Sequence, residues 1–525
     1  MVLLSSYRNG IFSQGYSVVV VFSMLNSQKL TISLDRDGEE PIYRQLIRHI
    51  RAQIESGTLP AGTRLPASRD LAHQLSISRI SVVNAYAELR SEGFLSAHAG
   101  RGTFIAGESN NAPPPTNGKN GSAAHDSETP TTPDRSIREM MRMARKPGII
   151  NFAQGAPPAD FFPFQHVRDS INTVLDRDGA KALGYEITEG FPPLRTAVRD
   201  YVSALGIRCT ADQVLITGGT QQGIDLVIQA LLSEGELLVT ENPTYLGMID
   251  IARARRVQIH GIDVDDSGIR LDMLENYIID NRPRLIYVMP TFQNPSGTVM
   301  PLHRRRQLLN LANDYQIPVL EDGVYHELRF EGESLPPLKA LDETGIVIHA
   351  SGFTKMMLPG IRIGYLICDN QHYERLVRVK QAADISTPAL NQRAMQLLLE
   401  RGVLSQQLER NNRDLRRRRD VALAAAARFL PPGSRWNTPV GGLYLWVQFP
   451  TNGPTAAEVF ITAIHMGVGY GIGTVFYTNG CGSHRLRINY ASQRPADIED
   501  GFRRIGRAWR EVALEYDELE KAPLF

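Results

Sequence analysis

The stretch ASGFTKMMLPGIRIGY, residues 350–365, places Lys355 seven positions before Arg362, just after an apolar run. A lysine amine can condense with an aldehyde to form a covalent imine, and a guanidinium close to it can bind a phosphate. Most lysines are solvated surface residues, so Lys355 alone carries little weight. Its chemistry depends on which other side chains the fold brings to this turn.

Candidate partners of Lys355 follow other short apolar runs, which predict strands. The segment TGGTQQG, residues 217–223, follows one run and opens a helix, so its amides, Thr220 and Gln221 can bind a phosphate. Three further apolar runs are each followed by a short polar motif, namely ENPTY, QNPSG and EDGVY. These motifs contain Tyr245, Asn294, Asp322 and Tyr325. Because parallel strands end at one edge of a sheet, we expect all of these residues to gather there.

These residue types match the needs of pyridoxal 5′-phosphate (PLP). PLP requires a lysine for its aldehyde, a carboxylate for its pyridine nitrogen, a phosphate site, donors for its ring hydroxyl and an aromatic ring against one face. Taken singly, TGGTQQG is a tight turn, Asp322 a helix cap and NPSG a turn. Five such motifs in order, each at a predicted strand end, predict PLP as the cofactor.

The same apolar runs predict the fold that positions these residues. From about residue 150, runs such as ELLVTE, RLIYVMP, PVLED and IVIHA alternate with amphipathic helices. This alternation predicts an α/β domain over 146–525, with a mostly parallel sheet covered by helices in a large subdomain of about 175–385. Beyond it, GGLYLWVQF and HRLRINYA predict strands of a smaller α+β subdomain.

Residues 150–525 resemble the fold type I, class I/II aminotransferases, near the aminoadipate and kynurenine branch. The resemblance implies that Lys355 holds PLP, that Asp322 pairs with the pyridine nitrogen and that Tyr245 stacks on the ring. It places Asn294 and Tyr325 at the ring oxygen. The residues that it assigns to the phosphate are Thr220, Gln221, Thr354 and Arg362.

Two more residues take roles from this resemblance. Tyr185, in LGYEITEG, resembles the catalytic-site tyrosine that the partner subunit supplies in an aminotransferase dimer. Arg487, in LRINYA, resembles the arginine that binds a substrate or effector carboxylate, although a charge at a strand edge remains its alternative explanation. The chain departs from the family at Gly352, where relatives often have Ser or Thr, and at GTVFY, residues 473–477.

A second module is predicted over residues 39–106. The segment PIYRQLIRHIRAQIESG predicts an amphipathic helix, SRDLAHQL a short helix, residues 79–92 a second one, and FLSAHAGRGTFIA a two-stranded wing. Residues 41–106 hold eight Lys/Arg and four Asp/Glu, whereas the whole chain has a net charge of only +1. A locally basic winged helix-turn-helix indicates DNA binding; periodicity alone leaves a protein-interaction domain open.

This module resembles the GntR family winged helix through its LP.SR.LA..L and AY..L..EGF patterns. The resemblance implies that Arg69, Ser78, Arg79 and Ser81 face DNA and that Arg101 lies on the wing. Ile80 departs from the family, which usually has a polar residue there.

The remaining segments are expected to be linkers or extensions. Residues 107–145 begin with a stretch rich in Pro, Gly, Ser and Asn and predict a flexible linker. Residues 1–38 predict a disordered N-terminal extension, whose apolar run at 17–25 is too short to span a membrane. The three cysteines suggest neither a disulfide framework nor a metal site and suit the cytoplasm. The arginine runs 304–306 and 416–419 are predicted to be solvated helix faces.

A winged helix, a linker and an aminotransferase-like domain, in this order, resemble the MocR-type subfamily of GntR regulators. The resemblance implies that the domain senses PLP, or an amino acid or amine effector that forms an aldimine with it. It also implies a homodimer on a double-stranded DNA operator with paired or repeated half-sites. A functional aminotransferase with an autoregulatory winged helix is the alternative function, and a protein-interaction scaffold is a third.

Overall fold

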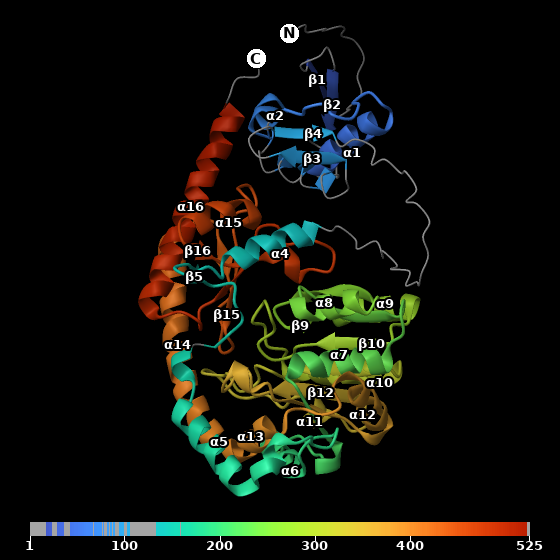
Figure 1. Ribbon diagram of the computed structural model, residues 1–525, viewed down its shortest axis with the longest axis vertical. Coiled ribbons are helices and arrows are strands. Elements are labelled where there is room, and N and C mark those ends of the chain that lie inside the picture. Colours follow the sequence, from blue (N-terminus) through green and yellow to red (C-terminus); the bar gives the residue numbers. More distant parts are fainter. Residues whose placement is uncertain are drawn as a thin grey trace, which may run out of the picture. The chain divides into compact units, whose positions relative to one another are not determined.

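The computed structural model describes residues 17–23, 29–35, 42–66, 68–75, 77, 81–82, 85–86, 88–89, 94–98, 102–105, 133–157 and 159–521. They belong to two compact units (Figure 1), one of residues 1–135 with 514–525 and one of residues 136–513. None of the helices in these described ranges is long and apolar enough to cross a membrane.

The N-terminal unit contains the predicted winged helix. Helices α1 (Ile42–Glu55) and α2 (Ser68–Leu75) precede the helical residues described between 81 and 89, and β3 (Leu95–His98) pairs antiparallel with β4 (Gly102–Ile105). Every element supplies buried apolar side chains to one core, among them Leu46, Ile50, Leu71, Val82, Leu89, Leu95 and Ile105. The hydroxyl of Tyr86 donates to the carbonyl of Pro66 at 2.9 Å and fixes the helix to the turn before α2.

The N-terminal extension differs from our expectation. Residues Ser17–Ser23 (β1) and Lys29–Asp35 (β2) form an antiparallel pair, and Ile32 and Leu34 are buried in the winged-helix core. The prediction that residues 1–38 are disordered is therefore wrong for these two strands. The missed signal is the alternation in LTISL, in which every second residue is apolar, as in a strand with one buried face.

The large subdomain is built on an eight-stranded sheet in the order β6-β13-β12-β11-β10-β7-β8-β9. Strands β8, β7, β10, β11 and β12 are parallel, while β13 runs antiparallel between β12 and β6. The strands are β6 (Val214–Thr217), β7 (Leu237–Asn242), β8 (Gln258–Asp265), β9 (Gly268–Ile269), β10 (Leu285–Val288), β11 (Val319–Asp322), β12 (Val347–Gly352) and β13 (Gly364–Ile367).

Helices cover both faces of this sheet, as predicted. In β10, Leu285 and Tyr287 point into one core and Ile286 and Val288 into the other, because successive side chains of a strand face opposite sides. The helices that follow the strands in this subdomain are α7 (Thr220–Leu231), α8 (Leu246–Ala254), α9 (Leu271–Asn281), α10 (Leu302–Asp314), α11 (Leu338–Leu341) and α12 (Asn370–Asp384).

The smaller subdomain has the two predicted strands at the centre of an antiparallel sheet. Its order is β14 (Arg435–Trp436), β15 (Tyr444–Gln448), β18 (Arg485–Asn489) and β17 (Gly471–Ile472). Strand β5 (Ile150–Asn151) pairs with β16 (Val468–Gly469). The helices outside the large sheet are α4 (Pro133–Met143), α5 (Phe164–Asp178), α6 (Pro192–Ser203), α13 (Ala389–Glu400), α14 (Val403–Phe429), α15 (Ala456–His465) and α16 (Pro495–Lys521).

The segment expected to be a linker, 107–145, contains α4 in its last part. Ile137, Met140 and Met141 of this helix pack against the core of the larger unit. These apolar side chains recur at the spacing of one helix face, which explains why the chain is ordered here although the preceding residues are polar.

Three arginines from the two charge runs are buried, so the prediction of solvated helix faces is wrong for them. Arg305 is 0% exposed, and Arg418 and Arg419 are 3% and 4% exposed. Arg418 donates to the carbonyl of Ala491 at 3.0 Å and forms an ion pair with Asp160. Such burial needs partners from distant loops, which a local run of charges does not reveal.

Candidate cofactor site

One cavity brings together most of the predicted cofactor residues at the carboxyl ends of the parallel strands. Eight predicted residues line it: Thr220, Gln221, Tyr245, Asp322, Tyr325, Thr354, Lys355 and Arg362. Sequence reasoning missed three apolar residues that also line it: Ile224, Met289 and Val324. The sequence predicts that these three side chains are buried, because they lie in apolar segments, but it gives no sign that they line a cofactor site.

Lys355 lies in the turn after β12 with its amine buried. Its Nζ donates to the carbonyl of Gly155 at 2.6 Å. Burial lowers the pKa of Lys355, since a charged amine is poorly solvated in this cavity. A lower pKa favours the neutral amine, which is the form that attacks an aldehyde.

Asp322, the last residue of β11, is oriented by two donors. Tyr287 donates its hydroxyl to Oδ2 at 2.9 Å, and the amide of Val324 donates to Oδ1 at 3.2 Å. Burial raises the pKa of Asp322 from an ordinary value of 3.8 to about 6. A cation beside this carboxyl would favour its ionised form, so the position suits a protonated pyridine nitrogen. Tyr287 was not predicted, because it lies inside the apolar run RLIYVMP.

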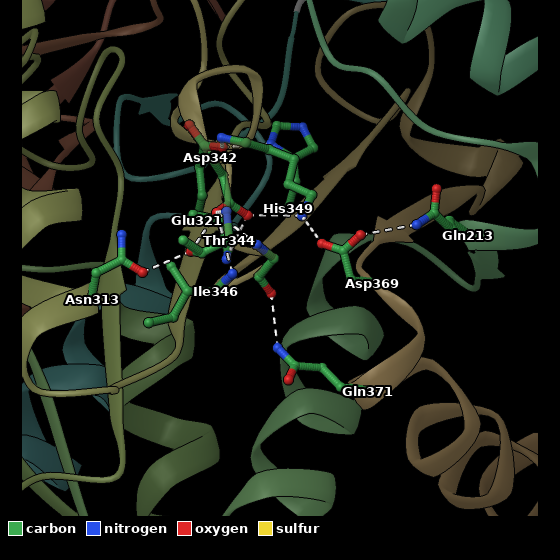
Figure 2. Close-up of polar contacts among 12 residues, drawn as sticks. Gln213, Asn313, Glu321, Asp342, Thr344, Ile346, His349, Asp369 and Gln371 are labelled. Atoms are coloured by element: carbon green, nitrogen blue, oxygen red, sulfur yellow. Dashed lines mark hydrogen bonds and ion pairs between the residues drawn. The ribbon is translucent and has the colours of Figure 1, made fainter.

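A polar network around Glu321 holds the end of β11 (Figure 2). His349 of β12 contacts Oε2 of Glu321 through Nδ1 at 2.8 Å, and Glu321 also accepts the amides of Leu338 and Lys339. A Cβ atom at Gly323 would lie 2.5 Å from Cε1 of His349. The imidazole therefore packs directly against the backbone that follows Asp322 and limits its movement.

In protein stripped of PLP, Asp322→Asn is expected to increase stability at neutral pH. The raised pKa of Asp322 means that the folded state holds the proton more tightly than the unfolded state does. Its stabilising contribution is present below pH 3.8 and is lost as pH rises through about 6. Urea unfolding at pH 7.5 should therefore show a gain of about 2–3 kcal/mol for the variant, and no gain at pH 4.

The exposed Asp314, at the end of α10, provides the matched control. Asp314→Asn should leave the pH dependence of unfolding unchanged. Equal stability of wild type and Asp322→Asn at pH 7.5 would contradict the conclusion that the ionised Asp322 carboxylate is destabilised by burial.

The residues predicted to bind the phosphate lie at the start of α7 and at Arg362. Gly219 has φ +105°, and a Cβ there would lie 2.6 Å from Nη2 of Arg362, so only glycine fits. The Oγ1 atoms of Thr220 and Thr354 are buried without a hydrogen-bond partner among the described residues. Two unpaired hydroxyls, a guanidinium and a helix N-terminus fit the phosphate of PLP.

The departure at Gly352 has a structural cause. Gly352 pairs with Gly364 of β13, and a Cβ atom at Gly352 would lie 2.8 Å from Cα of Gly364. The close approach of β12 and β13 therefore excludes the Ser or Thr that relatives often have at this position.

Arg487 and Asn294 lie together beside the cavity and do not line it. Nη1 of Arg487 donates to Oδ1 of Asn294 at 2.8 Å, and its guanidinium lies over the rings of Tyr444 and Phe476 at 4.3 and 4.7 Å. β18 is an inner strand and Arg487 is 6% exposed, so it is not a charge at a strand edge. Sequence reasoning missed Tyr444 and Phe476 because both lie within apolar segments.

Tyr185 lies apart from the cavity and is 86% exposed. Its position after η2 (Gly179–Leu183) leaves it free to enter the site of another subunit, which stays a prediction. Of the predicted DNA-contacting residues, Ser81 is described and half-buried. Ser78, Arg79, Arg101 and the side chain of Arg69 lie outside the described residues.

A mostly parallel sheet with a lysine turn after one strand and a carboxylate at the end of its neighbour defines the fold type I class of PLP-dependent proteins. PLP is accordingly the cofactor of this domain. Residues 147–505 match the family of class I and II aminotransferases, and residues 42–105 match the bacterial regulatory proteins of the gntR family. The larger unit belongs to the class I and II aminotransferase family, and with its GntR winged helix the chain belongs to the MocR-type subfamily of GntR regulators.

Two curated relatives differ in how much of the chain they match. The chain is 36% identical over 376 residues to 2-aminoadipate transaminase of Thermus thermophilus, which covers 71% of this chain and 93% of that protein. It is 28% identical over 501 residues to the probable rhizopine catabolism regulatory protein MocR of Rhizobium meliloti, covering 93% and 99%. Only the second similarity spans both units.

Among solved structures, α-aminoadipate aminotransferase LysN of Thermus thermophilus is similar to the larger unit. The TM-score is 0.68 with 34% sequence identity, over 72% of this chain and 95% of that chain. That enzyme was crystallised with N-(5′-phosphopyridoxyl)-L-leucine.

Proposed function

We propose that this protein is a transcription regulator whose aminotransferase-like domain senses PLP, or an amino acid or amine that reacts with PLP held at Lys355. One observation carries the proposal: a GntR winged helix and a cavity lined by eight of the predicted PLP residues lie on one chain, and the regulatory protein MocR is similar to 93% of that chain. A DNA-binding module needs no PLP chemistry of its own, so we infer that the site acts as the receptor.

The described side chains divide the work of binding. Bound PLP supplies an aldehyde that traps amines and a ring that withdraws electrons. Asp322 pairs with the ring nitrogen, Thr220 and Arg362 hold the phosphate, and Lys355 provides an amine that another amine can replace. Arg487 binds the carboxylate of an amino-acid effector, and its aromatic neighbours exclude water from that contact.

We further propose a homodimer that acts in the cytoplasm on an operator with paired or repeated half-sites. Two large apolar side chains next to Tyr185 in the chain are exposed, Leu183 at 69% and Ile187 at 47%. An exposed apolar surface of this kind favours association, and a second copy of the chain would bring Tyr185 to its site. Two-fold symmetry would present two winged helices to DNA.

A functional aminotransferase is the second candidate. The 36% identical relative is a transaminase, and this function would use the same Lys355 and Asp322, which line the cavity, and Arg487 beside it. Both functions need these residues, so the winged helix is what favours regulation.

The test is selection of genomic DNA fragments by the PLP-loaded protein, followed by fluorescence anisotropy at fixed salt on a selected fragment and a scrambled copy. Specific binding that changes when PLP is removed, or when an amino acid is added, supports the regulator. Failure to select any fragment, or affinity that ignores both PLP and amines, would exclude sensing through this site. Rapid amino-group transfer in the same preparation would favour the transaminase.

Arg79→Ala is expected to weaken operator binding, by about 1–3 kcal/mol if Arg79 reads a base, since the GntR resemblance implies that Arg79 faces DNA. Arg44→Ala, at the exposed start of α1, is the matched control for loss of one positive charge in the same unit. Anisotropy titrations at two salt concentrations compare them. An equal loss of operator affinity in the two variants would show that Arg79 does not contribute to specific recognition of the operator.

A further inference from the structure

Tyr444 is a buried tyrosine that the sequence did not place in the site. It begins β15 and is 2% exposed. Its hydroxyl lies 2.9 Å from the hydroxyl of Tyr325, and the two rings meet edge to face, with centroids 5.7 Å apart. Within the described part of the chain, neither hydroxyl has another hydrogen-bond partner.

Tyr444 also contacts the surroundings of Lys355. A Cβ atom on Gly155 would lie 2.8 Å from the Tyr444 hydroxyl and 3.9 Å from Nζ of Lys355. The hydroxyl and the amine therefore lie against the same glycine, whose carbonyl accepts from Lys355. On the ring face of Tyr444, the guanidinium of Arg487 stacks at 4.3 Å.

The number of protons decides the direction of the hydrogen bond between the tyrosines. A phenol has one hydrogen to donate and two lone pairs that can accept. If Tyr325 donates its hydrogen to the ring oxygen of PLP, it has none left for Tyr444. The bond can then form only if Tyr444 donates to the oxygen of Tyr325.

We propose that Tyr444 is a positioning residue that donates its hydrogen bond to Tyr325, orients the Tyr325 hydroxyl toward the ring oxygen of PLP and strengthens that donation. This inference rests on the proposed binding of PLP at Lys355. Hydrogen bonds in a chain polarise one another, so the outer donor strengthens the inner one. Tyr444 thus acts on the cofactor through Tyr325.

The consequence is a change in proton affinity at the Lys355–PLP linkage. Negative charge on the ring oxygen grows when the linkage loses its proton, so a stronger donor there favours the deprotonated form. The other titratable neighbours of Tyr325 are Tyr245 and Arg487, and those of Lys355 are Arg487, Asp322 and Arg362. All of them remain when only the Tyr444 hydroxyl is removed.

The experiment follows the visible absorption band of the PLP-loaded protein against pH in four variants. Tyr444→Phe should raise the pH midpoint of the band by on the order of 0.3 units, and Tyr325→Phe should raise it further. In the Tyr325→Phe background, Tyr444→Phe should have no additional effect, because the intermediate hydroxyl is absent. Tyr470→Phe is the control: it removes an equally buried hydroxyl, which donates to Ala456 at 2.7 Å.

The proposal is overturned if the midpoint of Tyr444→Phe equals that of wild type, or if the two substitutions shift it additively. An equal shift in Tyr470→Phe would also overturn it, since the effect would then be a general loss of stability. Failure of the PLP assignment is distinct: wild-type protein would show no band from PLP bound at Lys355.

Discussion

Lys355→Ala protein is expected to purify without covalently held PLP and to lack the visible absorption band of the wild type. Lys355 is the one lysine that lines the cavity described for this chain, and its buried amine has a lowered pKa. Alanine leaves the phosphate site and Asp322 intact, so PLP can still bind without a covalent link. The measurement is the absorption spectrum after dialysis, followed by borohydride reduction and mass spectrometry of the peptide that carries residue 355.

Two substitutions make this test specific. Lys355→Arg keeps a positive charge yet forms no imine with PLP, so it should lose the band as alanine does. Lys181→Ala, at an exposed position in η2, should keep it. A wild-type band in Lys355→Ala, or a reduced adduct on another lysine, would refute the assignment.

Arg305→Met is expected to destabilise the larger unit by about 3 kcal/mol. The guanidinium is 0% exposed and has no carboxylate hydrogen-bonded to it among the described residues. It donates to the carbonyls of Met300, Pro290 and Pro336 and to the hydroxyl of Thr291, at 2.8 to 3.0 Å. Methionine fills similar space and leaves three of these acceptors unpaired, since the carbonyl of Pro290 also accepts from the amide of Met300 at 2.8 Å.

The burial of the charge opposes part of this loss. Desolvation lowers the pKa of Arg305 to about 10, so removing the guanidinium relieves some of the cost of burying it. Three unpaired acceptors, each costing about 1–3 kcal/mol, still outweigh that relief. Because Arg305 holds the loop that leads to Asn294, the variant should also bind PLP less tightly.

Urea unfolding and PLP titration measure the two effects. Arg306→Met, at the exposed neighbouring position, should change stability by less than about 0.5 kcal/mol. Equal stability of the two variants would show that Arg305 contributes no more than a surface arginine does.

Much of the fold and the site could be predicted because polar residues mark the ends of apolar runs. Thr220, Tyr245 and Asp322 each follow such a run, and parallel strands bring their ends together. The order of the motifs along the chain then indicated their roles. This assignment of roles required no knowledge of the distances between the residues.

Residues inside apolar runs could not be predicted in the same way. Tyr287 and Tyr444 are polar only at their tips, and their partners Asp322 and Tyr325 are 35 and 119 residues away. Periodicity shows that such rings are buried, but it does not show which hydroxyl meets which acceptor. The same limit applies to Arg305, whose acceptors are mainly backbone carbonyls that have no sequence signature.

The close contact of Gly352 with Gly364 bears on how this site can evolve. Strand β13 also approaches the backbone of Gly219 and Thr220, since a Cβ at Gly364 would lie 2.6 Å from the carbonyl carbon of Gly219. Three backbone segments therefore meet with no room for a side chain. A single substitution at 352 cannot introduce a hydroxyl there, because the neighbouring strand would have to move as well. Any further side-chain donor for a phosphate at this site therefore has to come from positions other than 219, 352 and 364.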